Sequence, residues 1–98
     1  MQEIPKTFKK NGLILTLAQR TAKLALYEAR SPENKPRAWE VHKIRIMPPV
    51  IMKLGHIEKS LPEREVLAGN EQFGKYAWSY QHRENADRKY AELLQSNA

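Results

Sequence analysis

Apolar and polar residues alternate through much of the first half of the chain, which is the pattern of half-buried β-strands. Leucines occupy every second position in residues 13–17, and residues 23–28 repeat the pattern. Asn11-Gly12 stands directly before the first of these runs, and this dipeptide favours a tight hairpin because both of its positions accept positive φ. The sequence therefore predicts a strand over residues 7–10 that is joined to the next strand by a short turn.

The richness of residues 17–30 in alanine and leucine leaves a helix as the alternative there. The hairpin signal immediately upstream favours strands, as does the turn-like Gln19-Arg20-Thr21. Residues 31–36 are polar and contain two prolines, so they predict a loop.

Residues 39–47 form the clearest strand, because they are rich in β-branched and aromatic side chains and end at Pro48-Pro49. The alternation changes phase within this strand, because Trp39 and Val41 lie at odd positions whereas Ile44 and Ile46 lie at even positions. A bulge near His42 or Lys43 would bring both sets to one face. The alternative is a strand whose two faces are both partly covered.

The second half of the chain combines turn and helix signals. Ser60-Leu61-Pro62-Glu63 has the spacing of a capping box and predicts a short helix over residues 61–68, with a strand as the alternative. The remaining elements predicted in this half are a strand over residues 50–56 that ends in a glycine turn, a capped turn over 70–74, a strand over 77–80, and an amphipathic helix over 83–95.

These elements predict one small α+β domain over residues 1–98, with an antiparallel sheet of four to five strands and a C-terminal helix packed on one face. Which face the helix covers stays open. The expected core residues are Leu15, Leu17, Leu24, Leu26, Val41, Ile44, Ile46, Phe73, Trp78, Tyr90 and Leu93.

Charge is distributed unevenly between the two halves of the chain. The net charge is +6, and all of this excess lies in residues 1–50, because the acidic and basic residues of 51–98 cancel. A positive surface of this kind attracts an anionic partner, which could be nucleic acid or an acidic protein surface. The simpler alternative is a basic surface that only keeps the protein in solution.

The residue types that build most catalytic and metal sites are missing or scattered. The chain has no cysteine, which excludes disulfides, cysteine nucleophiles and cysteine-bound zinc, and its three histidines are widely spaced. His56-Ile57-Glu58 matches half of a zinc deaminase signature, but the other half requires cysteine. The sequence predicts no enzyme activity, no metal and no cofactor.

Targeting signals are weak as well. No apolar run approaches the ~20 residues that span a bilayer, so we expect no membrane partner. The apolar residues 13–18 after Lys9 and Lys10 lack the cleavage site of a signal peptide. A cytoplasmic location, in a bacterial cell or an infected host cell, is the expectation.

Basic residues interleave with aromatic ones on the predicted sheet, as in surfaces that bind phosphates and stack bases. We expect the strands that carry them to be neighbours, so that the cations form one continuous surface. For Trp39 the alternative is a place in the core beneath the helix. The candidate residues for binding nucleic acid or another partner are Lys9, Lys10, Lys23, Arg37, Trp39, Lys43 and Arg45.

Three segments, residues 25–28, 39–45 and 70–80, together with the closing helix, resemble small uncharacterised proteins of bacteriophages and mobile elements. The most specific part is the Phe-Gly-x-x-x-Trp-Ser motif at residues 73–79. The chain departs from the pattern at residues 66–69, where the similar sequences end a strand with a proline. The resemblance implies a bacterial or viral origin and a non-enzymatic accessory role, and it assigns no catalytic residue.

The function predicted from the sequence is a small accessory protein that binds nucleic acid through its basic N-terminal half. The alternative is a protein-binding module, such as a phage-encoded inhibitor of a host defence complex or a virion component. The sequence leaves the oligomeric state open.

Overall fold

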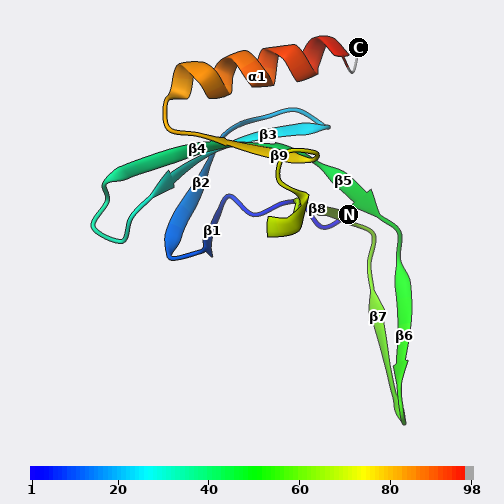
Figure 1. The fold of residues 1–98 in the computed structure, drawn as a ribbon. Coiled ribbons are helices and arrows are strands. Elements are labelled where there is room, and N and C mark those ends of the chain that lie inside the picture. The colour runs from blue at the N-terminus through cyan, green and yellow to red at the C-terminus, as the bar shows by residue number, and fades with distance from the viewer. Residues whose placement is uncertain (97–98) are drawn as a thin grey trace.

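The computed structural model describes residues 1–96, and its centre is a five-stranded antiparallel sheet, the main sheet. Its strands stand in the order β1-β2-β3-β4-β9, and helix α1 (Arg83–Ser96) lies across one face (Figure 1). The strand bounds are β1 Thr7–Lys10, β2 Leu13–Arg20, β3 Leu24–Arg30, β4 Pro36–Lys43 and β9 Ala77–Tyr80. The predicted α+β class, with a C-terminal helix on an antiparallel sheet, is confirmed.

The first hairpin forms at the predicted turn. Asn11 and Gly12 have φ angles of 53° and 77°, and β1 pairs with β2 without a break in register. The pairing of β2 with β3 shifts once, between Leu17 and Gln19. Residues 17–20 lie in β2 and residues 24–30 form β3, so the helical alternative for residues 17–30 is wrong.

The main sheet is covered on both faces, and each face has its own hydrophobic core. Tyr27 is fully buried in the core opposite α1, where its hydroxyl donates to Pro5 O at 2.7 Å and burial raises its pKa to about 12. The buried residues of the core under α1 are Leu24, Leu26, Val41, Ala86, Tyr90 and Leu93. Those of the opposite core are Ile4, Leu15, Ala25, Tyr27, Ala29 and Ile44.

Most predicted core residues belong to one of these two cores, and four do not reach full burial. Leu17, Phe73 and Trp78 are half-buried. Ile46 is 54% exposed, so its assignment to the core is wrong. It lies beyond the point at which the chain leaves the main sheet. The pattern missed several buried alanines, because alternation detects large side chains best, and it missed Ile4, which precedes the first strand.

The strand predicted over residues 39–47 is in fact two strands. β4 pairs regularly with β3 as far as Lys43, so the predicted bulge near His42 or Lys43 is wrong. Beyond Ile44 the chain enters β5 (Arg45–Met47), which pairs with β8 (Arg64–Val66) in a separate sheet. Both faces of β4 are covered, and Val41 and Ile44 belong to opposite cores, as the alternative interpretation expects.

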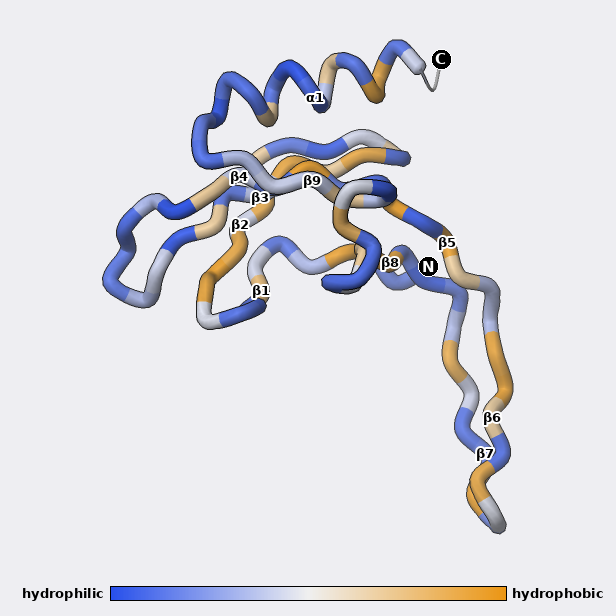
Figure 2. The backbone as a smooth tube through the Cα atoms, in the orientation of Figure 1, coloured by the Kyte–Doolittle hydropathy of each residue, from blue (hydrophilic) through white to orange (hydrophobic). Residues whose placement is uncertain are grey.

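Between β5 and β8 the chain forms a long hairpin, which we call the arm. Its strands are β6 (Val50–Leu54) and β7 (Ile57–Leu61), joined by a turn in which Gly55 has a φ of 61°. The arm extends away from the main sheet (Figures 1 and 2). Its first strand and glycine turn agree with the prediction for residues 50–56.

The helix predicted over residues 61–68 is wrong, because this segment contains the end of β7 and all of β8. The local capping pattern is outweighed by the backbone ladder that β8 forms with β5 and by the bridge between Gln2 and Arg64. The short 3₁₀ helix η1 (Asn70–Gln72) lies within the predicted capped turn over residues 70–74, and its N-cap is Gly69, one residue before that turn. Within residues 1–96, no helix is long and apolar enough to cross a membrane.

Candidate nucleic-acid interface

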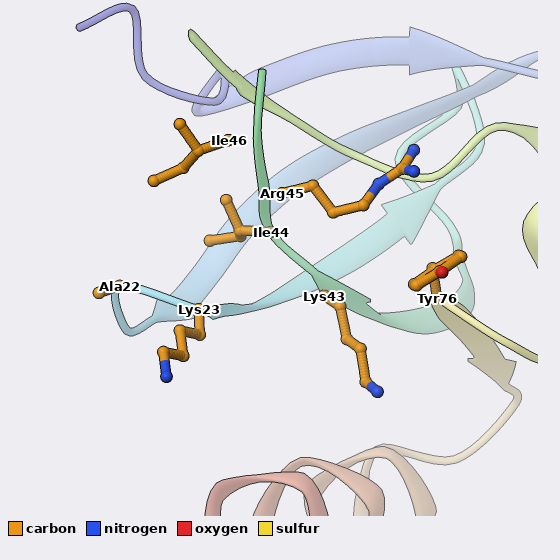
Figure 3. Close-up of a pocket in the computed structure, with 7 residues that line it drawn as sticks. All are labelled: Ala22, Lys23, Lys43, Ile44, Arg45, Ile46 and Tyr76. Carbon is orange, nitrogen blue, oxygen red and sulfur yellow. The ribbon is translucent and has the colours of Figure 1, made fainter. Parts of the chain in front are cut away.

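A shallow hollow lies at the end of the main sheet where β4 gives way to β5, and we call it the basic pocket (Figure 3). Its volume is about 370 Å³. Three segments line it: the turn before β3, the β4–β5 junction and the residue before β9. The lining residues are Ala22, Lys23, Lys43, Ile44, Arg45, Ile46 and Tyr76.

Backbone hydrogen bonds hold these three segments together. Ile44 N donates to Lys23 O, and Lys43 N donates to Tyr76 O, each at 2.8 Å. The turn itself is fixed by the Thr21 hydroxyl, which accepts from the backbone N–H groups of Lys23 and Leu24 at 3.1 and 3.0 Å. The frame of the pocket is therefore secondary structure and a capped turn, which positions side chains more firmly than a free loop does.

The pocket is positively charged, because its lining includes Lys23, Lys43 and Arg45 and no acidic residue. Lys23, Lys43 and Arg45 have no carboxylate oxygen within 4.0 Å anywhere in the described chain. Lys23 and Lys43 both extend toward the side of α1, whereas Arg45 points away from it (Figure 3). These charges are available to an anion from outside the chain.

Aromatic rings accompany the cations. The guanidinium carbon of Arg45 lies 4.9 Å from the centre of the Tyr76 ring, and Lys75 Nζ lies 5.4 Å from the same ring. Arg45 Nη2 also donates to Gln72 Oε1 at 3.0 Å, which orients the guanidinium. A half-buried ring flanked by cations is a combination that suits a phosphate with an attached base.

The structure brings together three of the seven candidate residues, Lys23, Lys43 and Arg45. Lys9 is exposed on β1, at one edge of the main sheet, and β2 and β3 separate it from β4. The expectation that β1 and β4 are neighbours, with one continuous basic surface, is therefore wrong. Arg37 is exposed near the opposite end of β4, six residues from Lys43, which corresponds to roughly 20 Å along a strand.

Lys10 does not belong to an exposed surface. Its Nζ atom is buried, 3.8 Å from Glu40 Oε1 and 4.2 Å from the centre of the Phe73 ring. The odd and even residues of β1 face opposite sides of the sheet, so Lys10 points into the core side while Lys9 does not. This core therefore contains a polar network that the sequence pattern did not predict.

The network continues from Glu40 to His42. His42 is fully buried, and its Nε2 lies 2.8 Å from Glu40 Oε1. The rings of Tyr27 and Phe73 pack edge-on against the imidazole, with centroid distances of 5.8 and 5.7 Å. These contacts fix the His42 ring within the core opposite α1.

Trp39 lies at the border of the core under α1, which agrees with the core interpretation. The guanidinium carbon of Arg83 lies 4.7 Å from the centre of its ring. Trp39 is not among the residues that line the basic pocket. The aromatic residue of the pocket is instead Tyr76, which the sequence analysis did not select. Its place in the Lys75-Tyr76 dipeptide, within the motif at residues 73–79, was the available signal.

No three His, Asp or Glu side chains in the described part of the chain lie close enough together to hold a metal ion. Comparison of the chain with protein-family models, curated proteins and solved structures finds no match.

Proposed function

We propose that the protein is a non-enzymatic accessory protein that binds single-stranded nucleic acid at the basic pocket. The observation that carries this proposal is that Lys23, Lys43, Arg45 and Tyr76 line one pocket, with no acidic residue in the lining. Lysines and arginines neutralise phosphates, and an exposed part of an aromatic ring stacks on a base. The bacteriophage and mobile-element proteins that the sequence resembles suggest an accessory role in such a setting.

The pocket favours single strands over duplex because of its size and its aromatic residue. A volume of about 370 Å³ is of the order that a small ligand occupies, and it does not form a groove for a double helix. A base can stack on Tyr76 only when it is free of its own neighbours. Lys23, Lys43 and Arg45 would then contact the adjoining phosphates.

The charge part of the proposal is tested by a salt titration of oligonucleotide binding, followed by fluorescence anisotropy. The variant Lys23→Gln/Lys43→Gln should flatten the slope of log affinity against log salt by about 1.4, since each lost contact to a single strand contributes about 0.7. The matched control is Lys6→Gln/Lys35→Gln, which removes the same charge from exposed positions outside the pocket. Its slope should stay close to that of the parent.

The stacking part is tested by Tyr76→Leu. This variant should weaken binding by about 1–3 kcal/mol while the salt slope stays unchanged, because the loss concerns a base and not a phosphate. If the parent does not bind oligonucleotides at about 50 mM salt, where electrostatic attraction is strong, the proposal is wrong and an acidic protein surface becomes the better partner. Equal slopes for the pocket and control variants would contradict the assignment to this pocket.

A further inference from the structure

The arm carries most of the exposed large apolar side chains of the described chain. Leu54 and Ile51 are each 64% exposed, and Ile57 is 69% exposed. Neither β6 nor β7 packs extensively against an element other than its own partner strand. Figure 2 shows the apolar stretches on the arm, well away from the main sheet.

The pairing of β6 with β7 sorts the arm residues into two faces. Directly opposed residues lie on the same side of an antiparallel ladder, and successive residues alternate. We call one side the apolar arm face; its residues are Val50, Met52, Leu54, Ile57, Lys59 and Leu61. The other side is mainly polar and consists of Ile51, Lys53, Glu58 and Ser60.

A lone two-stranded hairpin is at best marginally stable in water, and it becomes stable when a hydrophobic face is packed. No other element of the described chain packs extensively against the apolar arm face, so packing against another molecule would stabilise it. The bridge between Gln2 and Arg64 anchors only the base of the arm, at β8.

The charges of the arm indicate what kind of molecule this is. Lys53 stands opposite Glu58, so the polar face is close to neutral. The apolar arm face carries one charge, Lys59, among five apolar side chains. Nucleic acid or an acidic protein would find little opposite charge here, whereas a second apolar arm face matches it in composition.

The geometry of the face also suits a second copy. A two-fold axis along the arm places β6 of one copy on β7 of the other. Val50 then meets Leu61, Leu54 meets Ile57, and each Lys59 meets Met52 instead of a second Lys59. The lysine stem can cover apolar surface while its ammonium group reaches solvent.

We propose that two copies of this protein dimerise by packing their apolar arm faces together. The apolar arm face has six residues, whereas a standard interface has roughly 20–30 residues on each side, so the dimer is weak and depends on concentration. The proposal does not depend on nucleic-acid binding, because the basic pocket lies at the sheet end and not on this face.

Sedimentation velocity over a range of micromolar concentrations tests the proposal with two matched variants. Leu54 and Ile51 have the same exposure, 64%, but lie on opposite faces of the same strand. Leu54→Glu should weaken dimerisation by about tenfold or more, because it places a carboxylate in the interface. Ile51→Glu should dimerise like the parent, and circular dichroism should show that both variants are folded.

Three results would overturn the proposal. The first is a parent protein that stays monomeric at the highest concentration reached. The second is a dimer that Leu54→Glu leaves intact, or that both variants weaken equally. The third is a monomer that pellets with vesicles of anionic phospholipid and loses this property in Leu54→Glu, which would make a lipid surface the occupant of the arm.

Discussion

At the scale of single residues, the pair of Arg20 and Glu65 joins parts of the chain that are far apart in sequence. Arg20 donates to both carboxylate oxygens of Glu65, at 2.8 and 2.6 Å, and Ile4 N donates to Glu65 Oε1 at 3.1 Å. The hydrogen bonds from Arg20 hold the pKa of Glu65 below its usual value, and the pKa of Arg20 is raised in turn. One carboxylate thus connects β2, β8 and the N-terminal segment.

The first prediction concerns this carboxylate and pH. A lowered pKa in the folded state means that the pair stabilises the protein above the unfolded pKa of about 4.3, and that this contribution is lost as pH falls through the folded value. Glu65→Gln should therefore cost about 1.5–3 kcal/mol at pH 7, and the difference from the parent should shrink in acid. Urea unfolding across this pH range measures both effects.

The control for this prediction is Glu63→Gln, which removes the same charge from an exposed position two residues away. Its unfolding free energy should stay within about 0.5 kcal/mol of the parent at pH 7. A Glu65→Gln deficit of constant size from neutral to acid pH would contradict the assignment to an ion pair.

At the scale of elements, local signals were sufficient wherever the partner strand is close in sequence. The turn at Asn11-Gly12 and the alternation on both sides of it specify β1 and β2, because these strands pair with each other across a turn of two residues. The amphipathic stripe of residues 83–95 similarly specifies α1. The residues that determine these elements lie close together in the sequence, so a short stretch of sequence is enough to predict them.

Local signals failed where a distant strand decides the outcome. Residues 61–68 have a good capping pattern, yet β8 forms because β5 and Gln2 offer backbone partners. The split of β4 from β5 has the same origin, since pairing with β3 and β9 ends where the chain turns toward β8. No alternation pattern encodes the position of a partner that is many residues away.

The second prediction compares two glycines. Gly12 has a φ of 77° and open space around its missing Cβ, so Gly12→Ala should cost about 1–2 kcal/mol through backbone strain alone. Gly69 has a φ of −78°, and its nearest neighbour to an added Cβ is a Glu71 side-chain atom at 3.5 Å. Gly69→Ala should therefore be neutral or slightly stabilising. Equal unfolding free energies for the two variants would show that φ at position 12 is not the controlling factor.

At the scale of the whole molecule, the arm makes the protein more extended than its length requires. The radius of gyration is 15.3 Å, whereas a compact chain of about 100 residues has about 13 Å. Residues 48–63 contribute to neither hydrophobic core. The main sheet and α1 therefore form a body that should fold without the arm.

The third prediction removes the arm. Met47 and Arg64 are direct partners in the β5–β8 ladder, so an Asn-Gly turn in place of residues 48–63 can close it. This variant should melt within about 5 °C of the parent and give a radius of gyration near 12 Å in small-angle X-ray scattering. Loss of cooperative melting would show instead that the arm takes part in folding the body.

Only some residues of the basic pocket could be predicted from the sequence. The candidate residues included Lys23, Lys43 and Arg45, because excess charge is visible in composition. Lys10 was wrongly assigned to the exposed surface, because successive residues of a strand face opposite sides of the sheet and a shift of one residue decides between solvent and core. Tyr76 was missed because it becomes a neighbour of Lys43 only through the pairing of β4 with β9.

The arm leaves and re-enters the body at two residues that face each other across one ladder, and this has a consequence for evolution. Extra pairs of residues inserted beyond that ladder would leave both cores intact. Each doubling of the loop would add only about 0.6 kcal/mol of closure entropy. Arm length and arm sequence can thus drift independently of the body, and related chains should differ most between residues 48 and 63.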